Sequence, residues 1–285
     1  MIVITGASGQ LGRLVIEALL KKLPASEIVA AVRKPESVAD LAARGVTVRL
    51  ADYDRPDTLT SAFAGADKLL LISANEVGRR LPQHAAVIDA ARAAGVKLLA
   101  YTSLLHADHS PLGLAAEHKA TEALIRASGL PFVLLRNGWY TENYLASLPV
   151  ALAHGAVLGS AGEGRIASAS RRDYADAAAA VLSSDGHAGK IYELAGDESY
   201  TLSEFAATLA RASGKAVAYR DLPQAEYAGA LLAAGLPAPF AELIADSDAG
   251  AARGALFDAS HTLSRLIGRT TTPLAVLVEQ SLKQA

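Results

Sequence analysis

Short apolar runs alternate with helix-period segments along the first half of this 285-residue chain. The segments between the runs, for example 81–94 and 117–127, carry apolar residues three and four positions apart, which is the spacing of an amphipathic helix. The apolar runs are predicted strands at 2–5, 28–32, 46–50, 68–72, 96–101 and 132–136. Because strands and helices alternate, we expect an α/β fold with a Rossmann-type, doubly wound parallel sheet.

The regular alternation ends near Asn137. The capping-box sequence Thr201-Leu202-Ser203-Glu204 opens one predicted helix, and Asp246-Ser247-Asp248 is typical of a turn. The other expected elements are helices at 140–153, 173–183 and within 224–246, a turn-rich stretch at 155–164 and a strand at 191–194. We therefore predict a Rossmann domain over residues 1–136. Residues 137–285 are expected to form a smaller α/β subdomain on the substrate side, with some elements returning to the first domain.

A glycine-rich turn follows the first predicted strand and leads directly into a helix. Its sequence is Gly6-Ala7-Ser8-Gly9-Gln10-Leu11-Gly12. Gly6 is expected to permit the tight bend, Gly9 to let backbone amides approach a pyrophosphate, and Gly12 to let the helix pack closely on the strand. The free N–H groups at the positive end of the helix then bind the anion. The spacing G-x-x-G-x-x-G departs from the usual G-x-G-x-x-G, so the position after the first strand carries this prediction.

Arg33 stands at the end of the second predicted strand, about 20 residues beyond Gly12. A site for NAD places Asp or Glu near this point to bind the ribose 2′-hydroxyl, whereas a guanidinium suits the 2′-phosphate of NADP. The alternative is an ordinary surface arginine at a strand end. Because the glycine turn precedes it, we predict that the chain binds NADPH.

Charge and composition narrow the class of protein further. With 27 basic and 29 acidic residues, the charge balance does not favour nucleic acid or an anionic membrane as a partner. The absence of cysteine excludes disulfides and thiolate metal sites, and no grouping of histidines and carboxylates has the spacing of metal ligands. The chain enters a strand at once and contains no membrane-length apolar run, so we expect a cytoplasmic location. The oligomeric state stays open, with a homodimer as one possibility.

In an open α/β sheet, ligands bind outside the carboxyl ends of the strands. Asp52 and Tyr53 follow the third predicted strand. Ser73-Ala74-Asn75 follows the fourth and is expected to contact the pyrophosphate and the nicotinamide-side ribose, the alternative being a polar turn. Ser103 ends the fifth strand, where it could bind a carbonyl substrate or cap the next segment.

Short-chain dehydrogenases combine such a serine with a Tyr-x-x-x-Lys motif, and this chain has no tyrosine within 104–127. The nearest substitutes are His106, His109 and His118-Lys119, and each histidine is more readily a structural residue than an acid. Reduction of a ketone develops an alkoxide that needs a proton promptly, whereas hydride addition to a quinone gives a stabilised phenolate. The missing tyrosine therefore favours a quinone as the acceptor.

An aromatic segment, residues 137–144, follows the sixth predicted strand and contains the single tryptophan of the chain. Aromatic faces beside a cleft suit a flat ring next to a nicotinamide. For Trp139 the alternative is core packing at a hinge. Tyr140 and Asn143, together with Ser103, are the candidates to steady a quinone oxygen.

Four segments of the chain resemble the bacterial type 2 NAD(P)H:quinone oxidoreductases, which belong to the NmrA-like, atypical short-chain dehydrogenases. These segments are 5–12, 68–73, 101–108 and 135–145, and the similarity continues at 192–197 and 245–250. Triphenylmethane reductase is similar as well, but less so over 103–108. The resemblance thus extends over nearly the whole chain.

The resemblance implies a flavin-free, two-electron reduction of quinones to hydroquinones, with NADPH preferred over NADH, in a cleft between the two domains. It implies cofactor contacts at Gly6, Ala7, Ser8, Gly9, Gln10, Leu11, Arg33, Ser73, Ala74, Asn75, Asn137, Gly138, Trp139, Tyr140, Thr141 and Glu142. Relatives without the tyrosine and lysine pair include regulators that bind the nucleotide without turning it over. A sensor of NADP(H) and a reductase of another conjugated acceptor, such as a triarylmethane dye, are therefore the alternatives.

Overall fold

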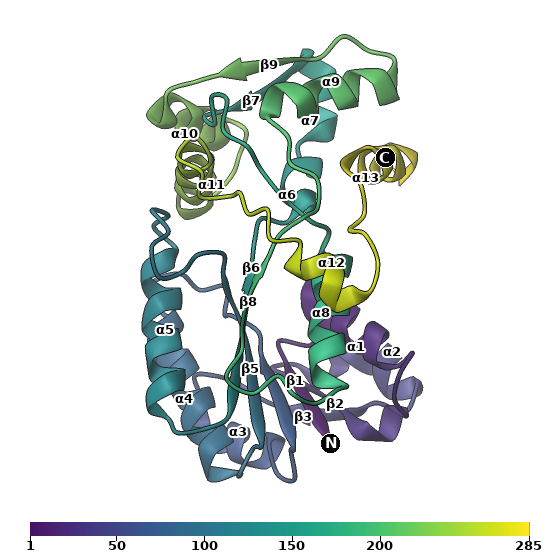
Figure 1. Ribbon diagram of the computed structural model, residues 1–285, viewed down its shortest axis with the longest axis vertical. Coiled ribbons are helices and arrows are strands. Elements are labelled where there is room, and N and C mark those ends of the chain that lie inside the picture. Colours follow the sequence, from purple (N-terminus) through teal and green to yellow (C-terminus); the bar gives the residue numbers. More distant parts are fainter. Residues whose placement is uncertain (285) are drawn as a thin grey trace. The chain divides into compact units, whose positions relative to one another are not determined.

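A computed structural model describes residues 1–284, and the chain divides into two compact units (Figure 1). Unit 1 comprises residues 1–107, 116–137 and 171–192, and unit 2 comprises residues 108–115, 138–170 and the chain from 193 onwards. Residues 108–115 thus belong to unit 2, although they precede residue 137, and residues 171–192 belong to unit 1.

Unit 1 is built on a seven-stranded sheet with the order β3-β2-β1-β4-β5-β6-β8. The strands are β1 (Ile2–Thr5), β2 (Ile28–Val32), β3 (Thr47–Leu50), β4 (Lys68–Leu71), β5 (Leu98–Leu104), β6 (Phe132–Asn137) and β8 (Ile191–Leu194). Every neighbouring pair from β3 to β6 is parallel. The strand order reverses direction at β1, with β2 on one side and β4 on the other. This is the doubly wound arrangement, so the predicted fold class is confirmed.

Helices cover both faces of this sheet (Figure 1). One face carries α3 (Pro56–Ala62), α4 (Arg80–Ala93) and α5 (Ala115–Ala127), and the other carries α1 (Gln10–Leu19), α2 (Ala39–Ala43) and α8 (Arg171–Leu182). Two short 3₁₀ turns, η1 (Ala25–Glu27) and η2 (Pro35–Val38), lie next to β2 and α2.

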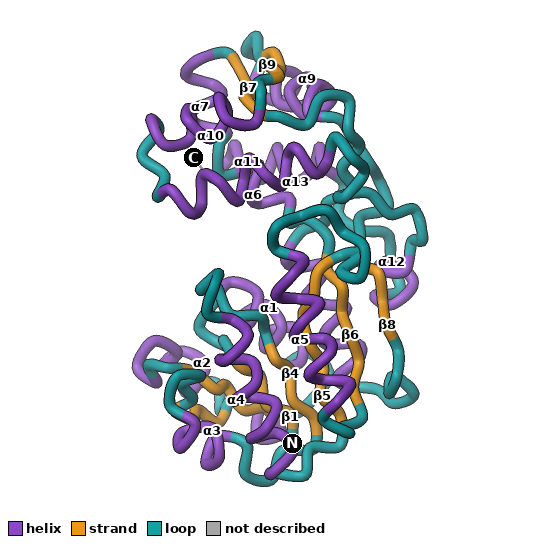
Figure 2. Tube along the Cα trace, turned by 90° about the vertical axis from the view of Figure 1, so that its left-hand side faces the viewer, coloured by secondary structure: helices purple, strands orange, loops and turns teal. Residues whose placement is uncertain are grey.

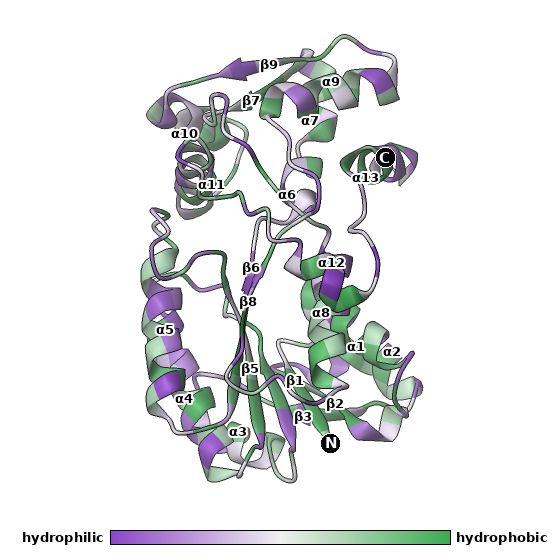
Figure 3. Ribbon diagram, viewed as in Figure 1, coloured by the Kyte–Doolittle hydropathy of each residue, from purple (hydrophilic) through white to green (hydrophobic). Residues whose placement is uncertain are grey.

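The core of unit 1 lies between the sheet and its helices. All four residues of β1 are buried, which is why its first three residues are all apolar instead of alternating with polar ones. On the α3 and α4 face, Val3 and Leu69 belong to the same buried cluster as Phe63 and Val87. Figure 3 shows the apolar strands β1 and β5 between helices that carry polar residues as well.

Unit 2 is mostly helical, with a small two-stranded parallel sheet (Figure 2). The strands are β7 (Ala156–Gly159) and β9 (Ala218–Asp221). The helices are α6 (Thr141–Leu145), α7 (Leu148–His154), α9 (Leu202–Ser213), α10 (Gln224–Ala233), α11 (Ala238–Ala251), α12 (Thr262–Ile267) and α13 (Leu274–Gln284). The predicted capping box is present: the Glu204 N–H donates to the Thr201 hydroxyl, and the Glu204 carboxylate accepts from the Thr201 N–H.

Three expectations for the second half of the chain were wrong. The turn-rich stretch 155–164 contains β7, whose partner β9 is distant in the sequence and therefore invisible to local composition. The helix expected over 140–153 is two helices, since Pro149 fits only the first turn of a new one. The expected turn at Asp246–Asp248 is helical, within α11, and Asp248 is fully buried.

None of the helices within residues 1–284 is both long and apolar enough to cross a bilayer. Within the same residues, no group of three or more histidines and carboxylates is arranged to hold a metal ion.

Candidate functional site

The glycine turn joins the carboxyl end of β1 to α1. Gly6 adopts a φ of +59°, in the left-handed region that favours glycine. The Gly9 N–H donates to the Gly6 carbonyl oxygen over 3.0 Å, and Gly9 is the residue just before α1, where it provides no side-chain cap. A Cβ on Gly12 would lie 2.5 Å from the Gly6 carbonyl oxygen. Glycine at position 12 therefore lets α1 sit tightly against the turn, with first-turn amides that no side chain of the described residues caps.

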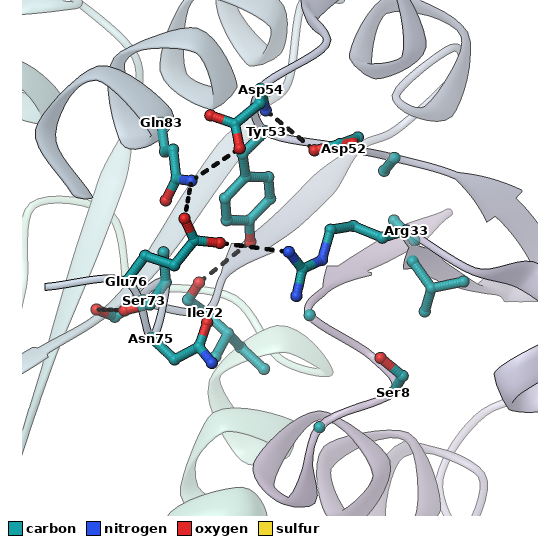
Figure 4. A pocket seen from close by; sticks show the side chains of 16 residues that line it. Ser8, Arg33, Asp52, Tyr53, Asp54, Ile72, Ser73, Asn75, Glu76 and Gln83 are labelled. Carbon is teal, nitrogen blue, oxygen red and sulfur yellow. Dashed lines mark hydrogen bonds and ion pairs between the residues drawn. The ribbon is translucent and has the colours of Figure 1, made fainter. Parts of the chain in front are cut away.

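A pocket of about 270 Å³ opens beside this turn (Figure 4). Its walls come from the loops after β1, β2, β3 and β4, and thus from both sides of the point where the strand order reverses. The lining residues are Gly6, Ser8, Gly9, Ala31, Val32, Arg33, Ala51, Asp52, Tyr53, Asp54, Ile72, Ser73, Ala74, Asn75, Glu76 and Gln83. Open α/β sheets bind their ligands at such a switch point.

Arg33 and Glu76 face each other across this pocket (Figure 4). The Arg33 Nη1 atom lies 3.3 Å from Glu76 Oε1, and the Arg33 side chain is 62% exposed. Glu76 Oε2 accepts from Arg79 Nη1 over 2.9 Å and from Gln83 Nε2 over 3.4 Å. Gln83 Nε2 also donates to Asp54 over 3.1 Å. The guanidinium predicted to bind a phosphate is therefore already paired with a carboxylate.

Tyr53 forms part of the pocket wall. Its hydroxyl oxygen lies 2.5 Å from Thr5 Oγ1 and 3.1 Å from the Ile72 carbonyl oxygen. Burial raises the pKa of Tyr53 far above its ordinary value, so the phenol is neutral at physiological pH. Tyr53 thus joins the ends of three parallel strands and presents an aromatic surface to the pocket.

The loop after β4 is fixed by hydrogen bonds to side chains of β5 and α4. The Ser73 N–H donates to Thr102 Oγ1 over 2.9 Å. The Ala74 N–H donates to His84 Nε2 over 2.9 Å, and Arg80 Nε donates to the Ala74 carbonyl oxygen over 2.6 Å. Burial, together with the charge of Arg80, lowers the pKa of His84 to about 4, so this ring is neutral and can accept. The backbone at Ser73 and Ala74, where the chain lines the pocket, is therefore held in place.

His118, one candidate to replace the missing tyrosine, is buried in the core of unit 1. Its Nδ1 atom lies 2.8 Å from the Tyr101 hydroxyl, and its Nε2 atom lies 3.5 Å from Arg80 Nη1. Burial and the positive charge of Arg80 lower the pKa of His118 to about 3. A neutral, enclosed imidazole with these partners does not supply a proton to a substrate at neutral pH.

Ser103 lies at the end of β5, and its hydroxyl donates to Glu122 Oε1 over 2.7 Å. Arg136 binds the same carboxylate through Nε and Nη2, each over 2.8 Å. Burial raises the pKa of Glu122, but the hydrogen bonds from Arg136 and Ser103 outweigh it and hold the pKa below its ordinary value. This geometry favours a structural role for Ser103, and Ser103 does not line the pocket.

The pocket brings together only part of the predicted cofactor set, namely Gly6, Ser8, Gly9, Arg33, Ser73, Ala74 and Asn75. Ala7 and Leu11 are buried around the turn, and Gln10 begins α1. Asn137 is buried at the end of β6. Sequence reasoning did not select Asp54, Glu76 or Gln83; Glu76 directly follows the selected Ser73–Asn75, whereas nothing local marks Gln83.

Residues 138–142 belong to unit 2. Trp139 is buried, and its ring centroid lies 6.4 Å from that of Tyr144. The Tyr144 hydroxyl donates to Asp248 Oδ1 over 2.8 Å. Tyr140 and Asn143 are half-buried at the start of α6. Trp139 and Tyr144 thus anchor this segment in the core of unit 2, while Tyr140 and Asn143 retain exposed surface.

Residues 6–185 match the NAD(P)H-binding family. Quinone oxidoreductase 2 of Escherichia coli (strain K12) is 61% identical over 275 residues, which cover 96% of each chain. The crystal structure of the E. coli NADPH-dependent quinone oxidoreductase complexed with NADPH has a TM-score of 0.97, 60% identity, and coverage of 99% of this chain and 100% of that one. The triphenylmethane reductase of Citrobacter sp., complexed with NADP(H), has a TM-score of 0.95, 42% identity, and the same coverage. The chain belongs to the NAD(P)H-binding family and, within it, to the NmrA-like quinone oxidoreductases of type 2.

Proposed function

We propose that this protein is an NADPH-dependent reductase that converts quinones to hydroquinones by direct hydride transfer, without flavin. The observation that carries the proposal is the 61% identity to E. coli quinone oxidoreductase 2 along 96% of both chains. In this proposal the nucleotide binds in the pocket at the switch point of unit 1.

The donor set of the pocket fits NADPH. The first-turn amides of α1 suit a pyrophosphate, and the exposed guanidinium of Arg33 suits a 2′-phosphate. The volume of about 270 Å³ is slightly below the roughly 300–1,000 Å³ of whole small-molecule pockets, so it suits the adenosine half of a dinucleotide and not the whole cofactor. The other predicted contacts, Asn137 to Glu142, complete the cofactor site in this proposal.

Bound NADPH supplies the hydride. The chain itself contributes mainly position, because hydride transfer needs the nicotinamide C4 and the accepting atom of the quinone held about 3–3.5 Å apart. Tyr140 and Asn143 are the proposed hydrogen-bond partners of the quinone oxygen on which negative charge develops. The hydroquinone also requires a proton, and since His118 is neutral and enclosed, water is its proposed source. Ser103 supports the end of β5 through Glu122 in this scheme.

A second candidate is a reductase of triarylmethane dyes, which the 42% identity to the Citrobacter enzyme favours. A panel of acceptors distinguishes the candidates. We expect saturable oxidation of NADPH, after subtraction of the uncatalysed rate, with benzoquinones and naphthoquinones, and slower turnover with a triarylmethane dye. Faster dye turnover would favour the second candidate. Tight NADPH binding without turnover of any acceptor would indicate a nucleotide sensor.

The cytoplasmic location expected from the sequence stays a prediction, and the oligomeric state stays open, with a homodimer as the form to test first. Light scattering of the purified protein tests the oligomeric state, and fractionation of the cells that make it tests the location.

A further inference from the structure

We propose that Glu76 determines cofactor specificity together with Arg33, by occupying in the free protein the position that a 2′-phosphate takes on the guanidinium. The inference rests on the proposed NADPH site. It adds Glu76 as a residue that lowers the affinity for NADPH relative to the affinity for NADH. Glu76 follows β4 and Arg33 follows β2, so the pair spans β1 and the pocket between them.

The contact distances indicate which partner of Glu76 is released most easily. Oε1 lies 3.3 Å from Arg33 Nη1, whereas Oε2 accepts from Arg79 Nη1 over 2.9 Å and also from Gln83. If Arg33 turns to a phosphate, the Glu76 carboxylate keeps the shorter of its ion pairs. When Arg33 turns from Glu76 to the phosphate, the Glu76 carboxylate therefore still has a partner, and the change costs little free energy.

The charges around the pocket make Glu76 a direct competitor of the 2′-phosphate for Arg33. The side chains that line the pocket carry one cation, Arg33, and three carboxylates, those of Asp52, Asp54 and Glu76. Of these acids, Glu76 is the one that contacts Arg33. A 2′-phosphate that binds the Nη1 side of the guanidinium takes the place of the Glu76 carboxylate, and it then lies close to the negative charge of that carboxylate. A 2′-hydroxyl need not take that place.

In this proposal the Glu76 carboxylate also binds NADH, from the loop after β4 instead of from the end of β2. Acidic side chains in NAD sites accept a hydrogen bond from the ribose 2′-hydroxyl. With Arg33 and Glu76 in one pocket, the site offers one group for each cofactor, the guanidinium for the 2′-phosphate and the carboxylate for the 2′-hydroxyl. Glu76 thus narrows the difference in affinity between NADPH and NADH.

The test compares the dissociation constants of NADPH and NADH for the full-length wild type and for Glu76→Gln, measured by titration at low ionic strength. Exposed ion pairs contribute about 0.2–1 kcal/mol, so we expect the ratio of the NADH to the NADPH dissociation constant to rise about 1.5- to 5-fold. The rise should shrink in high salt, because exposed charges are screened. Glu27→Gln is the matched control: it removes the same charge at the opposite end of β2, outside the pocket, and should leave the ratio unchanged.

An unchanged or lower ratio in Glu76→Gln would overturn the inference, and so would an equal rise in Glu27→Gln. In an Arg33→Gln background the effect of Glu76→Gln on NADPH should decrease; an undiminished effect would contradict the competition for Arg33. A failure of the proposed function would give a different result from a failure of this inference. In that case the wild type would not bind NADPH, or would bind it without quinone-dependent oxidation, irrespective of Glu76.

Discussion

The Ser103 hydroxyl donates a 2.7 Å hydrogen bond to Glu122, a carboxylate that is 1% exposed. Ser103 therefore ends β5 at the position of a substrate-binding serine, but its proton is directed to a buried side chain. The carboxylate is also bound by Arg136 and Arg126, so it keeps charged partners when the serine is removed.

Ser103→Ala should consequently affect stability more than catalysis. A hydrogen bond to a charged group contributes about 1.5–3 kcal/mol, so urea unfolding should show a loss of roughly that size. The kcat for a naphthoquinone should stay within about 2-fold of wild type. Tyr140→Phe and Asn143→Ala provide the contrast, with an expected loss of about 10-fold or more in kcat. A large kcat loss in Ser103→Ala at unchanged stability would restore Ser103 as a substrate contact.

Gly12→Ala should damage the nucleotide site and the fold together. The new Cβ would lie 2.5 Å from the Gly6 carbonyl oxygen, so α1 has to move away from the turn. We expect a stability loss of about 1–3 kcal/mol and weaker binding of both NADPH and NADH, measured by thermal unfolding and titration. Gly229→Ala, inside α10 with open space around the new Cβ, should be neutral or stabilising. If Gly12→Ala binds both cofactors normally, the close packing at the turn is unimportant for the site.

Arg33→Glu should weaken NADPH binding much more than NADH binding. The change removes a charge-assisted partner of the 2′-phosphate and adds a repulsive charge. The lost interaction alone corresponds to a loss of about 10-fold or more in affinity for NADPH. Lys22→Glu, an equal charge reversal at an exposed residue outside the pocket, serves as the control. Equal losses for both cofactors in Arg33→Glu would contradict the assignment of Arg33 to the 2′-phosphate.

Because of Asp248, the free energy of unfolding should vary with pH between about pH 4 and pH 7. Burial raises the pKa of Asp248 to about 6, although Tyr144 and the Ser160 N–H donate to it. Because the folded-state pKa lies above the unfolded one, this group's contribution to stability is greatest below about pH 4 and is lost as pH rises through 6. Relative to wild type, Asp248→Asn should therefore gain up to about 3 kcal/mol between pH 4 and pH 7. Urea unfolding of both proteins across this range measures the difference; a difference that does not change with pH would show that Asp248 titrates normally.

The parts of the site that the sequence predicted are those set by local backbone chemistry. The requirement for glycine at positions 6 and 12 follows from the strand, turn and helix pattern, and the end of β2 fixes Arg33 beside that turn. Glu76 and Gln83 reach the pocket only because β4 lies next to β1, which depends on the order of the strands. A linear pattern of apolar residues does not contain that order.

The same limit explains the errors in the second half of the chain. The pairing of β7 with β9 joins Ala156 to Ala218, and neither four-residue strand has a recognisable pattern by itself. Asp248 was expected in a turn because aspartate and serine favour turns in isolation. In the folded protein its carboxylate bonds with Tyr144 and the Ser160 N–H, and these distant partners favour the buried helical position.

The central claim is that the pocket of unit 1 binds NADPH for the reduction of quinones. The most direct measurement is the initial rate of NADPH oxidation at 340 nm with a naphthoquinone, compared with NADH at the same concentration and corrected for the uncatalysed reaction. The account predicts saturable, quinone-dependent turnover that has a higher kcat/KM with NADPH than with NADH in the wild type, and that loses this preference in Arg33→Glu. No quinone-dependent turnover, or a preference for NADPH that survives in Arg33→Glu, would contradict it.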